Sequence, residues 1–477
     1  MAGDLNVHGT AVRTPDTTVA SRSTRTLRSL RSDPLRRRWL LWGILALTFL
    51  LVNVYRLSTA VISGELMGAF DTTGGQLGTL HAVFFFVYAV MQIPTGVLVD
   101  RVGPRLTAAA GAAVMNAGAV WFALATGYAG AFGGRFLIGL GGSVIFVSML
   151  RFCTNWFRTD EFETMNGLSF AVGGIGGILA TTPFAVVVDS AGWRSTVLGL
   201  GLLGLVFAVA TLAFVRNSAE GADFDPIEGV PERPRLSIAE VRSYTAAVLT
   251  DRWTWVIAVL LYCTGGVNLT LVGLWGIPYV TQAYDVSVTA ASTITLLGGI
   301  GAVVGPPAFG RLSEYLERRT ELIVAGAVVH TAGLAFVAAV GTPPLVSVGV
   351  VFLVVGSLLG AFVLTYPMIR ARYDDRASGI AFGAINGSAF FGAATFPTLM
   401  GWALDAYWTG EYVDGVRVYT LSGYRVAFAL GAAAGVVAIG CALWLHRHAE
   451  DPAAEDPAAE DPDADGEAAR ASPDGNG

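Results

Sequence analysis

The ten residues Gly96-Val97-Leu98-Val99-Asp100-Arg101-Val102-Gly103-Pro104-Arg105 separate two long apolar segments of the chain. Gly103 and Pro104 favour a tight turn, and Gly96 allows two helices to approach closely. Asp100, at a helix end, is placed to accept hydrogen bonds from a facing helix N-terminus and to pair with a nearby Arg. The stretch therefore predicts a short, charged connection between two apolar helices.

Composition assigns the whole chain to the membrane proteins. Of its 477 residues, 53% are hydrophobic and 14% are charged, and the mean hydropathy is +0.58. Apolar stretches that are long enough to cross a bilayer recur along the sequence. The sequence therefore predicts an all-α membrane protein with twelve transmembrane helices. We place these spans at 39–63, 79–99, 106–126, 130–150, 165–188, 195–215, 254–279, 287–309, 322–341, 344–368, 378–404 and 424–446.

Arginine is distributed unevenly between the two ends of these spans. All thirty basic residues are Arg; with a cytoplasmic N-terminus, 25 of them fall on one side and three on the other, while Arg56 and Arg135 lie inside spans. By the positive-inside rule both termini are then cytoplasmic, and we expect the protein in the cell membrane. An acidic chain without Lys is also typical of a salt-adapted prokaryote.

The longest polar connection lies in the middle of the chain, after the sixth span. In it Ser237 and Glu240 fit a capping box, which predicts a short interfacial helix. The C-terminal tail is acidic and of low complexity, so we expect it to be disordered. These features predict an Arg-rich cytoplasmic tail, a six-helix bundle, a cytoplasmic linker, a second six-helix bundle and an acidic cytoplasmic tail, at 1–38, 39–215, 216–252, 253–446 and 447–477.

The two halves repeat at a distance of 214 residues. Parallel repeats of six helices, related by an axis along the membrane normal, are one known plan of secondary transporters. Such a plan predicts pseudo-symmetric bundles with a substrate site between them, near the midplane. The aligned pairs are Gly96 and Gly310, Asp100 and Glu314, Arg105 and Arg319, Gly173 and Gly387, and Pro183 and Pro397.

These features together resemble the major facilitator superfamily. The opening stretch matches the family's G-x-x-x-D-R-x-G-x-R loop, and Gly310-Arg311-Leu312-Ser313-Glu314 is a degraded copy of it. The resemblance covers about 39–446, and it implies two six-helix bundles that rock around a central site. Supporting matches are Gln92-Ile93-Pro94, Arg135-Phe136-Leu137-Ile138-Gly139-Leu140-Gly141 and Gly192-Trp193-Arg194.

The resemblance also implies a conformational role for the charged loop, because the corresponding latch in the family favours the outward-open state. We expect Arg151 to pair with Asp100 and Arg370 to pair with Glu314. The alternative is a solvated loop that the arginines only order. The candidate gating residues are Gly96, Asp100, Arg101, Gly103, Arg105, Arg135, Arg151, Gly310, Glu314 and Arg370.

Arg56 lies inside the first apolar helix, and charges at such depth usually face a protein interior or a wet cavity. The run Tyr55-Arg56-Leu57-Ser58-Thr59-Ala60-Val61 resembles the first helix of organophosphate exchangers and organic-anion symporters, which place a substrate-binding Arg there. A guanidinium offers a bidentate fork to carboxylate or phosphate. The alternatives are an Arg that snorkels to the outer interface and a structural ion pair. Further candidate substrate ligands, each equally suited to helix–helix hydrogen bonding, are Asn53, Tyr88, Gln92, Asn268 and Asn386.

Two departures from these families restrict the expected class of substrate and the expected mode of transport. The shift of 214 places Thr270 where organophosphate exchangers have a second Arg, and no Asp or Glu lies deep in a span. Proton coupling by a buried carboxylate therefore has no candidate. We expect a small organic monoanion of carboxylate type, moved by uniport or exchange. The alternatives are an efflux transporter of a drug or metabolite, and a non-transporting membrane sensor.

The sequence predicts no enzyme, no cofactor and no metal site. The spans hold no nucleophile–base constellation, and Cys153, Cys263 and Cys441 form no C-x-x-C motif. His81 is placed near the outer surface, where the second span opens, and His330 is interpreted as structural. We expect a monomer whose partners are a small anionic molecule and the lipid bilayer, with no nucleic acid.

Overall fold

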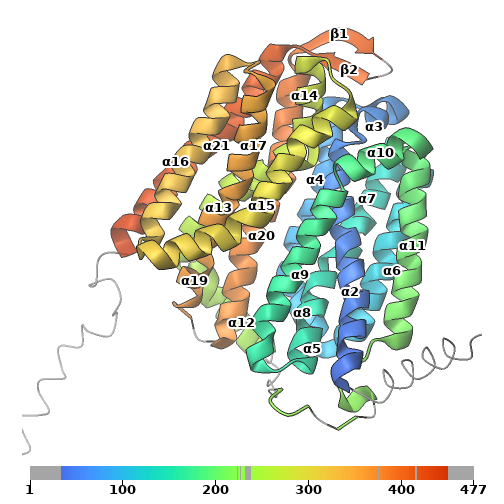
Figure 1. The fold of residues 1–477 in the computed structure, drawn as a ribbon, viewed down its shortest axis with the longest axis vertical. Helices are drawn as coiled ribbons and strands as arrows, with labels where there is room; N and C mark the ends of the chain where they lie inside the picture. The colour runs from blue at the N-terminus through green and yellow to red at the C-terminus, as the bar shows by residue number, and fades with distance from the viewer. Residues whose placement is uncertain are drawn as a thin grey trace, which may run out of the picture.

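The computed structural model of the protein describes residues 34–222, 224–225, 227–230, 238–373, 375–413 and 416–449. The predictions for the N-terminal tail before residue 34, for Ser237 of the capping box and for the acidic tail from residue 450 lie outside the described residues. The described part consists almost entirely of helices, arranged as two bundles side by side (Figure 1).

The first half of the chain forms the bundle on the right of Figure 1. Pro34 and Pro104 each begin a helix, which suits a residue without an N–H because the first turn leaves that group unbonded. Gly103, just before Pro104, has a φ of +89°, which glycine adopts without strain. The elements are α2 (Pro34–Leu57), η1 (Ser58–Ala60), α3 (Ser63–Phe70), α4 (Gly74–Val90), α5 (Gln92–Val102), α6 (Pro104–Leu124), α7 (Tyr128–Ser143), α8 (Ile145–Trp156), α9 (Thr159–Leu179), α10 (Thr182–Ala191) and α11 (Trp193–Phe214).

The second half forms the bundle on the left. Between the bundles, the linker carries a 3-10 turn, η2 (Glu220–Ala222), and a helix, α12 (Ile238–Thr250), close to the predicted interfacial helix. The seventh span is interrupted by η3, a π-helical turn of the kind that often marks functional sites. The elements are α13 (Arg252–Thr270), η3 (Leu271–Trp275), α14 (Gly276–Tyr284), α15 (Val288–Leu316), α16 (Arg319–Val340), α17 (Leu345–Ser357), α18 (Leu359–Val363), α19 (Thr365–Arg370), α20 (Asp375–Asp405) and α21 (Leu421–Ala449).

The count of spans agrees with twelve. Among the described residues, ten helices are long and apolar enough to cross a membrane, and two bent pairs raise the number to as many as twelve. In one bent pair, α3 meets α4 at 115°, so α3 lies across the end of the bundle. The second span is instead continued by α5, after a break at Met91. The predicted fold of twelve helices in two bundles is thereby confirmed.

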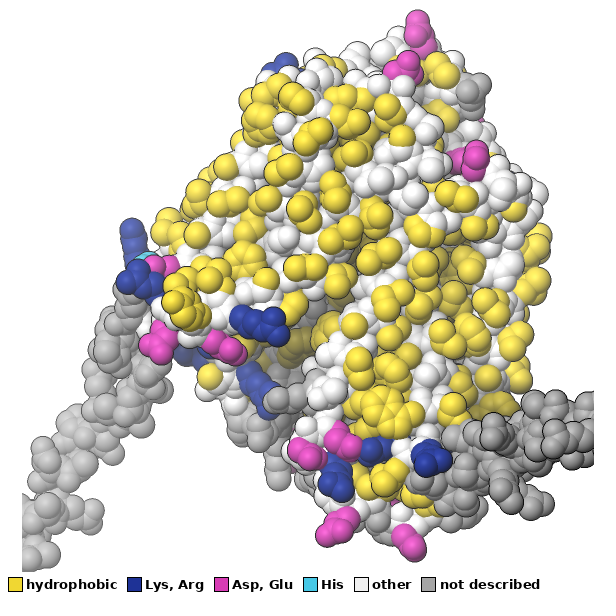
Figure 2. Space-filling model, viewed as in Figure 1, with side chains coloured by type: hydrophobic (Ala, Val, Ile, Leu, Met, Phe, Trp, Pro, Cys, Tyr) yellow, Lys and Arg dark blue, Asp and Glu magenta, His cyan; other side chains and the backbone are white. Residues whose placement is uncertain are grey.

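The surface of the molecule matches a bilayer. Figure 2 shows hydrophobic side chains over the flanks of both bundles and charged side chains gathered near the two ends. On α11, for example, Val206 and Val209 expose 62% and 67% of their surface. Apolar area of this extent on the outside is costly in water and favourable against lipid chains.

One end of the molecule carries a short β-hairpin, which the sequence analysis does not predict. Strands β1 (Trp408–Val413) and β2 (Val416–Tyr419) pair antiparallel between α20 and α21. We call this end the hairpin side, and we call the opposite end, which carries α12, the linker side (Figure 1).

The two bundles touch at the hairpin side and separate toward the linker side. At the hairpin side α4 and α20 cross closely: a Cβ placed on Gly78 would overlap the carbonyl of Pro397. At the linker side, Cβ atoms placed on Gly96 of α5 or on Gly383 of α20 would meet nothing within 4 Å. Figure 1 shows the bundles diverging in this direction, and Figure 2 shows the surface hollowed between them. The structure is therefore open toward the linker side.

Candidate functional site

Arg56 lies in the last turn of α2, at the boundary between the two bundles. Its guanidinium carbon is 4.8 Å from the ring centre of Tyr88, 5.2 Å from that of Phe390 and 5.8 Å from that of Phe84. Phe84 and Tyr88 belong to α4, whereas Phe390 belongs to α20 of the other bundle. We call these three rings the aromatic box. Their contacts place the guanidinium between the bundles, where a snorkelling Arg would not be.

The guanidinium is only partly satisfied by the protein. Nη1 donates to Oδ1 of Asn53 at 3.2 Å, and Nε is buried without a partner among the described residues. Nη2 donates no hydrogen bond within this part of the chain, and no described carboxylate lies within ion-pair distance of Arg56. A structural ion pair among the described residues therefore does not explain this half-buried charge.

Asn53 is built into the first bundle rather than into open space. Its side chain is 7% exposed, and Nδ2 donates to the carbonyl of Phe49 at 3.0 Å. Asn53 packs against α9, because a Cβ placed on Gly176 of that helix would lie 2.9 Å from the Cβ of Asn53. Both ends of the amide are thus held by protein, so Asn53 fixes the position of Arg56.

Arg135 contacts the backbone of α2 at Tyr55 and Arg56, and the sequence analysis does not predict this contact. It lies on α7, is 3% exposed, and Nη1 donates to the carbonyl of Tyr55 at 2.6 Å. Nη2 lies 3.5 Å from the carbonyl of Arg56. These carbonyls belong to the last turn of α2, where unpaired acceptors and the helix dipole favour a cation. Its guanidinium also lies 5.2 Å from the centre of the Phe84 ring, so both arginines contact one ring.

The other predicted ligands are distributed unevenly around the aromatic box. Gln92 is partly exposed and lies one turn from Tyr88, to whose carbonyl Nε2 donates at 3.4 Å. Asn386 is partly exposed, one turn from Phe390 on α20, and accepts a hydrogen bond from Tyr366 at 3.1 Å. These two amides lie on the linker side of the box, toward the opening.

Asn268 and Thr270 of α13 are fully enclosed. Asn268 is 3% exposed, and its Nδ2 has no partner among the described residues. Thr270, which stands where a second Arg occurs in organophosphate exchangers, donates to the carbonyl of Gly266 within its own helix. No hydrogen bond joins either residue to Arg56 in the described chain. The structure therefore does not bring this pair into the Arg56 cluster.

The charged loop on the linker side has the expected ion pair. Nη2 of Arg151, on α8, lies 3.2 Å from Oδ1 of Asp100, on α5. Arg105 donates from Nε and Nη2 to the carbonyl of Leu212, so it caps the end of α11. A Cβ placed on Gly103 would lie 2.6 Å from the amide of Asn217, which excludes a larger residue. Both contacts hold the loop to its own bundle.

Two expectations for these loops are not met in this state. Gly96 faces open space rather than a closely packed helix, because the bundles separate at this end. Arg101, in the same loop, is exposed. Glu314 is exposed and forms no ion pair with Arg370. Gly310, the counterpart of Gly96, is equally unpacked. The loop of the second bundle therefore lacks the ion pair of the first.

On the hairpin side, a carboxylate joins the bundles. Asp405 ends α20, and its two oxygens accept hydrogen bonds from the backbone nitrogens of Gly74 and Gly75 at 2.7 and 2.8 Å. Tyr419 of β2 donates to the same carboxylate at 3.3 Å, and Nη1 of Arg417 lies 3.8 Å from it. The missed hairpin thus holds the residue that caps the N-terminus of α4. An Asp at a span end is the sequence signal, but the backbone nitrogens of Gly74 and Gly75 that it binds come from the other bundle.

His81 is enclosed by protein, which the sequence analysis does not predict. It is 0% exposed, within α4, and lies one turn from Phe84 and Phe85. The ring contacts Phe85 at 5.1 Å between centres. Gly273 of η3 and Leu57 of α2 cover it, and its place relative to the outer membrane surface stays a prediction.

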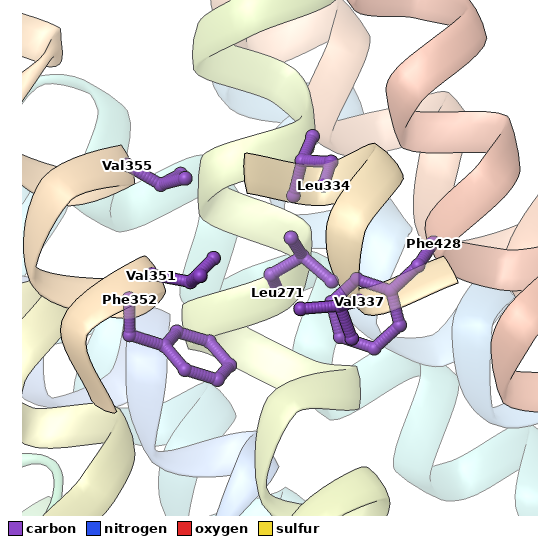
Figure 3. A pocket seen from close by; sticks show the side chains of 7 residues that line it. All are labelled: Leu271, Leu334, Val337, Val351, Phe352, Val355 and Phe428. Carbon is purple, nitrogen blue, oxygen red and sulfur yellow. The ribbon is translucent and has the colours of Figure 1, made fainter. Parts of the chain in front are cut away.

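A small cavity in the second bundle is lined only by apolar side chains. Figure 3 shows Leu271, Phe352 and Phe428 among them, and no polar atom points into the space. It offers nothing to a charged ligand. Within the described residues, no group of three or more His, Cys, Asp or Glu could hold a metal ion.

Comparisons with known proteins agree with this architecture. The family model described as Major Facilitator Superfamily matches residues 41–276 and 268–473. A probable sulfoacetate transporter of Cupriavidus necator is 23% identical over 398 residues, covering 79% of this chain and 89% of that protein. A D-galactonate transporter of Escherichia coli is 22% identical over 405 residues, covering 79% and 91%.

Solved structures show the same fold. A bacterial homologue of the human lysosomal transporter Spinster, in an inward-facing and unoccupied conformation, superposes with a TM-score of 0.69. The two share 15% identity, and the match covers 86% of this chain and 97% of that one. Taken with the family model, which matches nearly the whole length from the first span onward, these observations establish that the chain belongs to the Major Facilitator Superfamily.

Proposed function

We propose that this protein transports a small organic anion across the membrane by alternating access. The observation that carries the proposal is the guanidinium of Arg56, which lies between the bundles with Nη2 unbonded and no carboxylate partner among the described residues. The cost of such a charge is recovered when an anion pairs with it in a dehydrated site. The printed names of two relatives, for sulfoacetate and D-galactonate, support an acid as substrate.

The substrate site takes its parts from both bundles. Arg56 binds the anionic group, with Asn53 and Arg135 holding its side chain and backbone. Tyr88 and Phe390 close over the guanidinium from opposite bundles, and Gln92 and Asn386 line the approach from the linker side. Asn268 joins the site only when the second bundle shifts, because in this state it is enclosed. One guanidinium with neutral donors favours a compact monoanion.

The orientation follows from the arginines. With the linker side in the cytoplasm, 25 of the thirty Arg lie there or in the cytoplasmic tails, as the positive-inside rule requires. This state then opens to the cytoplasm. Asp100 with Arg151 belongs to the cytoplasmic gate, and Arg101, Arg105, Glu314 and Arg370 lie near it. We place the protein in the cell membrane of a prokaryote, as a monomer with the domain boundaries given by the sequence.

The test is transport in proteoliposomes that contain the full chain. Uptake and counterflow of radiolabelled sulfoacetate, galactonate, acetate and glycerol 3-phosphate are compared for wild type, Arg56→Gln and Arg56→Lys. We expect at least one carboxylate or sulfonate to be transported, Arg56→Gln to lower its uptake at least tenfold, and Arg56→Lys to retain part of it.

Arg425→Gln is the control, because Arg425, at the start of α21 and away from the aromatic box, donates to the backbone carbonyls of Ala338 and Ala339. It should transport as wild type. Undiminished anion uptake by Arg56→Gln would contradict the proposal. Transport of a lipophilic cation that tolerates this substitution would instead support the efflux alternative.

A further inference from the structure

A buried polar group, His81, lies on α4 one turn before Phe84, a ring of the aromatic box, on the hairpin side of it. His81 is 0% exposed, and neither Nδ1 nor Nε2 has a hydrogen-bond partner among the described residues. An imidazole carries at least one N–H donor, and buried polar groups of this kind are nearly always bonded. An orphaned ring at full burial needs an explanation beyond packing.

The ring lies exactly where the two bundles meet on the hairpin side. A Cβ placed on Gly273, in η3 of the second bundle, would lie 3.2 Å from Nε2 and from Cε1 of His81. Leu57 of the first bundle reaches the same point, at 3.3 Å. Movement of η3 away from α4 would therefore expose the ring to water, and the return of η3 buries it.

The charges around the His81 ring decide whether the neutral imidazole or the imidazolium can be buried there. Arg135, on α7, is a cation, and its guanidinium lies 5.2 Å from the centre of the Phe84 ring, one turn along α4 from His81. From α2, Leu57 reaches the ring together with Gly273 of η3, and the cation Arg56 contacts Phe84, one turn along α4 from His81. No described carboxylate lies within ion-pair distance of Arg56 or Arg135. An imidazolium in the empty, closed site would add a fully buried cation near buried Arg135 and half-buried Arg56, without an anion, which is strongly disfavoured.

An anion on Arg56 changes this balance, because it supplies the negative charge that the protein does not. We propose that His81 is the proton-binding site of this transporter. The ring is neutral in the empty state that is closed on the hairpin side; it takes a proton when that side opens, and keeps it during closure only if an anion is bound. The proton binds the lone pair of the unprotonated ring nitrogen. Because the ring itself is enclosed while the linker side is open, the proton leaves to the water that replaces the anion beside the partly exposed Arg56. Anion and proton then cross together. The dependence of proton retention on a bound anion rests on the proposed function.

The sequence offers a matched control. His330 is also 0% exposed, and both its ring nitrogens also lack a partner in the described chain. It lies on α16, inside the second bundle, against Phe362 at 5.8 Å between ring centres. It shares the burial of His81 but not the bundle interface or the arginines.

The first experiment needs no substrate. Spin labels on Ala129→Cys and Glu411→Cys, exposed residues of the two bundles at the hairpin side, report the separation of that side in lipid nanodiscs. We expect the population with the long distance to rise at least threefold between pH 8 and pH 5 in the wild type and in His330→Gln. In His81→Gln and His81→Phe it should not change with pH. Two variants are used because one may fold poorly, and circular dichroism checks the helix content of each.

The second experiment uses D-galactonate, a monoanion, as the probe in proteoliposomes with a pH-sensitive dye inside. An inward pH gradient should drive accumulation in the wild type and in His330→Gln, whereas His81→Gln should exchange galactonate without accumulation or proton movement. If the probe is not transported at all, the proposed substrate class is wrong while the first experiment still decides the role of His81. A pH response in His81→Gln and His81→Phe equal to that of the wild type would overturn the inference.

Discussion

The carboxylate of Asp405 caps the first turn of α4 across the bundle interface, with Oδ1 2.7 Å from the backbone nitrogen of Gly74. The bond joins the last residue of α20 in one bundle to the first residue of α4 in the other. A negative charge at a helix N-terminus meets both unbonded N–H groups and the positive end of the helix dipole. Because the two helices belong to different bundles, the cap exists only while the hairpin side is closed.

Removal of this cap should favour opening of the hairpin side. A hydrogen bond to a charged group contributes about 1.5–3 kcal/mol, so Asp405→Ala should shift the equilibrium roughly tenfold to a hundredfold toward the state open there. Spin-label distances across the hairpin side measure the shift. Asp71→Asn is the control, since Asp71 is exposed on the same side in a left-handed conformation that Asn tolerates. An unchanged distance distribution in Asp405→Ala would contradict the prediction.

Arg135 should act on transport through Arg56 rather than by touching the substrate. In Arg135→Gln the carbonyls of Tyr55 and Arg56 lose a charged donor, so the last turn of α2 becomes less well fixed. We expect KM for the anion to rise at least fivefold and Arg135→Lys to recover part of the loss, because Lys keeps the charge with fewer donors. Initial rates over a substrate series separate KM from the maximal rate. A pure fall in the maximal rate would indicate a gating role instead.

The ion pair of Asp100 and Arg151 should matter little for stability. Both side chains are partly exposed, at 38% and 23%, and such pairs contribute about 0–1 kcal/mol. Asp100→Asn and Arg151→Gln should therefore leave thermal unfolding within a few degrees of wild type. If the pair instead sets the balance of states, as the loop motif implies, transport should fall severalfold. The exchanged variant, Asp100→Arg with Arg151→Asp, tests this, and restored transport would assign the effect to the pair.

The sequence predicts the elements of this fold well because lipid imposes simple rules. Apolar length, arginine asymmetry and the loop at Asp100 are local signals, and they locate twelve spans and one ion pair. The site is predicted in part: Arg56 is recognisable as a charge at depth, but the rings of Phe84 and Phe390 that enclose it look like ordinary core residues. Contacts between helices that are far apart in the chain leave no periodic pattern in the sequence.

The missed features share that cause. The capping of α2 by Arg135, the burial of His81 and the link from Asp405 to α4 all depend on which helices become neighbours. The absence of the pair between Glu314 and Arg370 has a second reason. The 214-residue repeat preserves residue types, but it does not preserve the conformation of each loop in a given state, so an aligned acid need not meet an aligned Arg.

Two glycines of the second span should report opposite ends of the transport cycle. A Cβ on Gly78 would overlap the carbonyl of Pro397, so Gly78→Ala must hold α4 and α20 apart and disfavour closure of the hairpin side. A Cβ on Gly96 meets nothing within 4 Å in this state, so Gly96→Ala should not disturb it. If Gly96 packs closely when the linker side closes, as its loop motif implies, Gly96→Ala should instead disfavour that closure.

The pair is measured in one assay. With spin labels across each side, Gly78→Ala should increase the population open on the hairpin side, and Gly96→Ala should increase the population open on the linker side; both should slow counterflow at least threefold. The two variants add the same single methyl group, so a general loss of stability would affect both distance distributions alike. If both variants shift the open populations equally and in the same direction, neither glycine makes a contact that is specific to one state. The close packing of α4 against α20 at Gly78 would then not be specific to the state closed on the hairpin side.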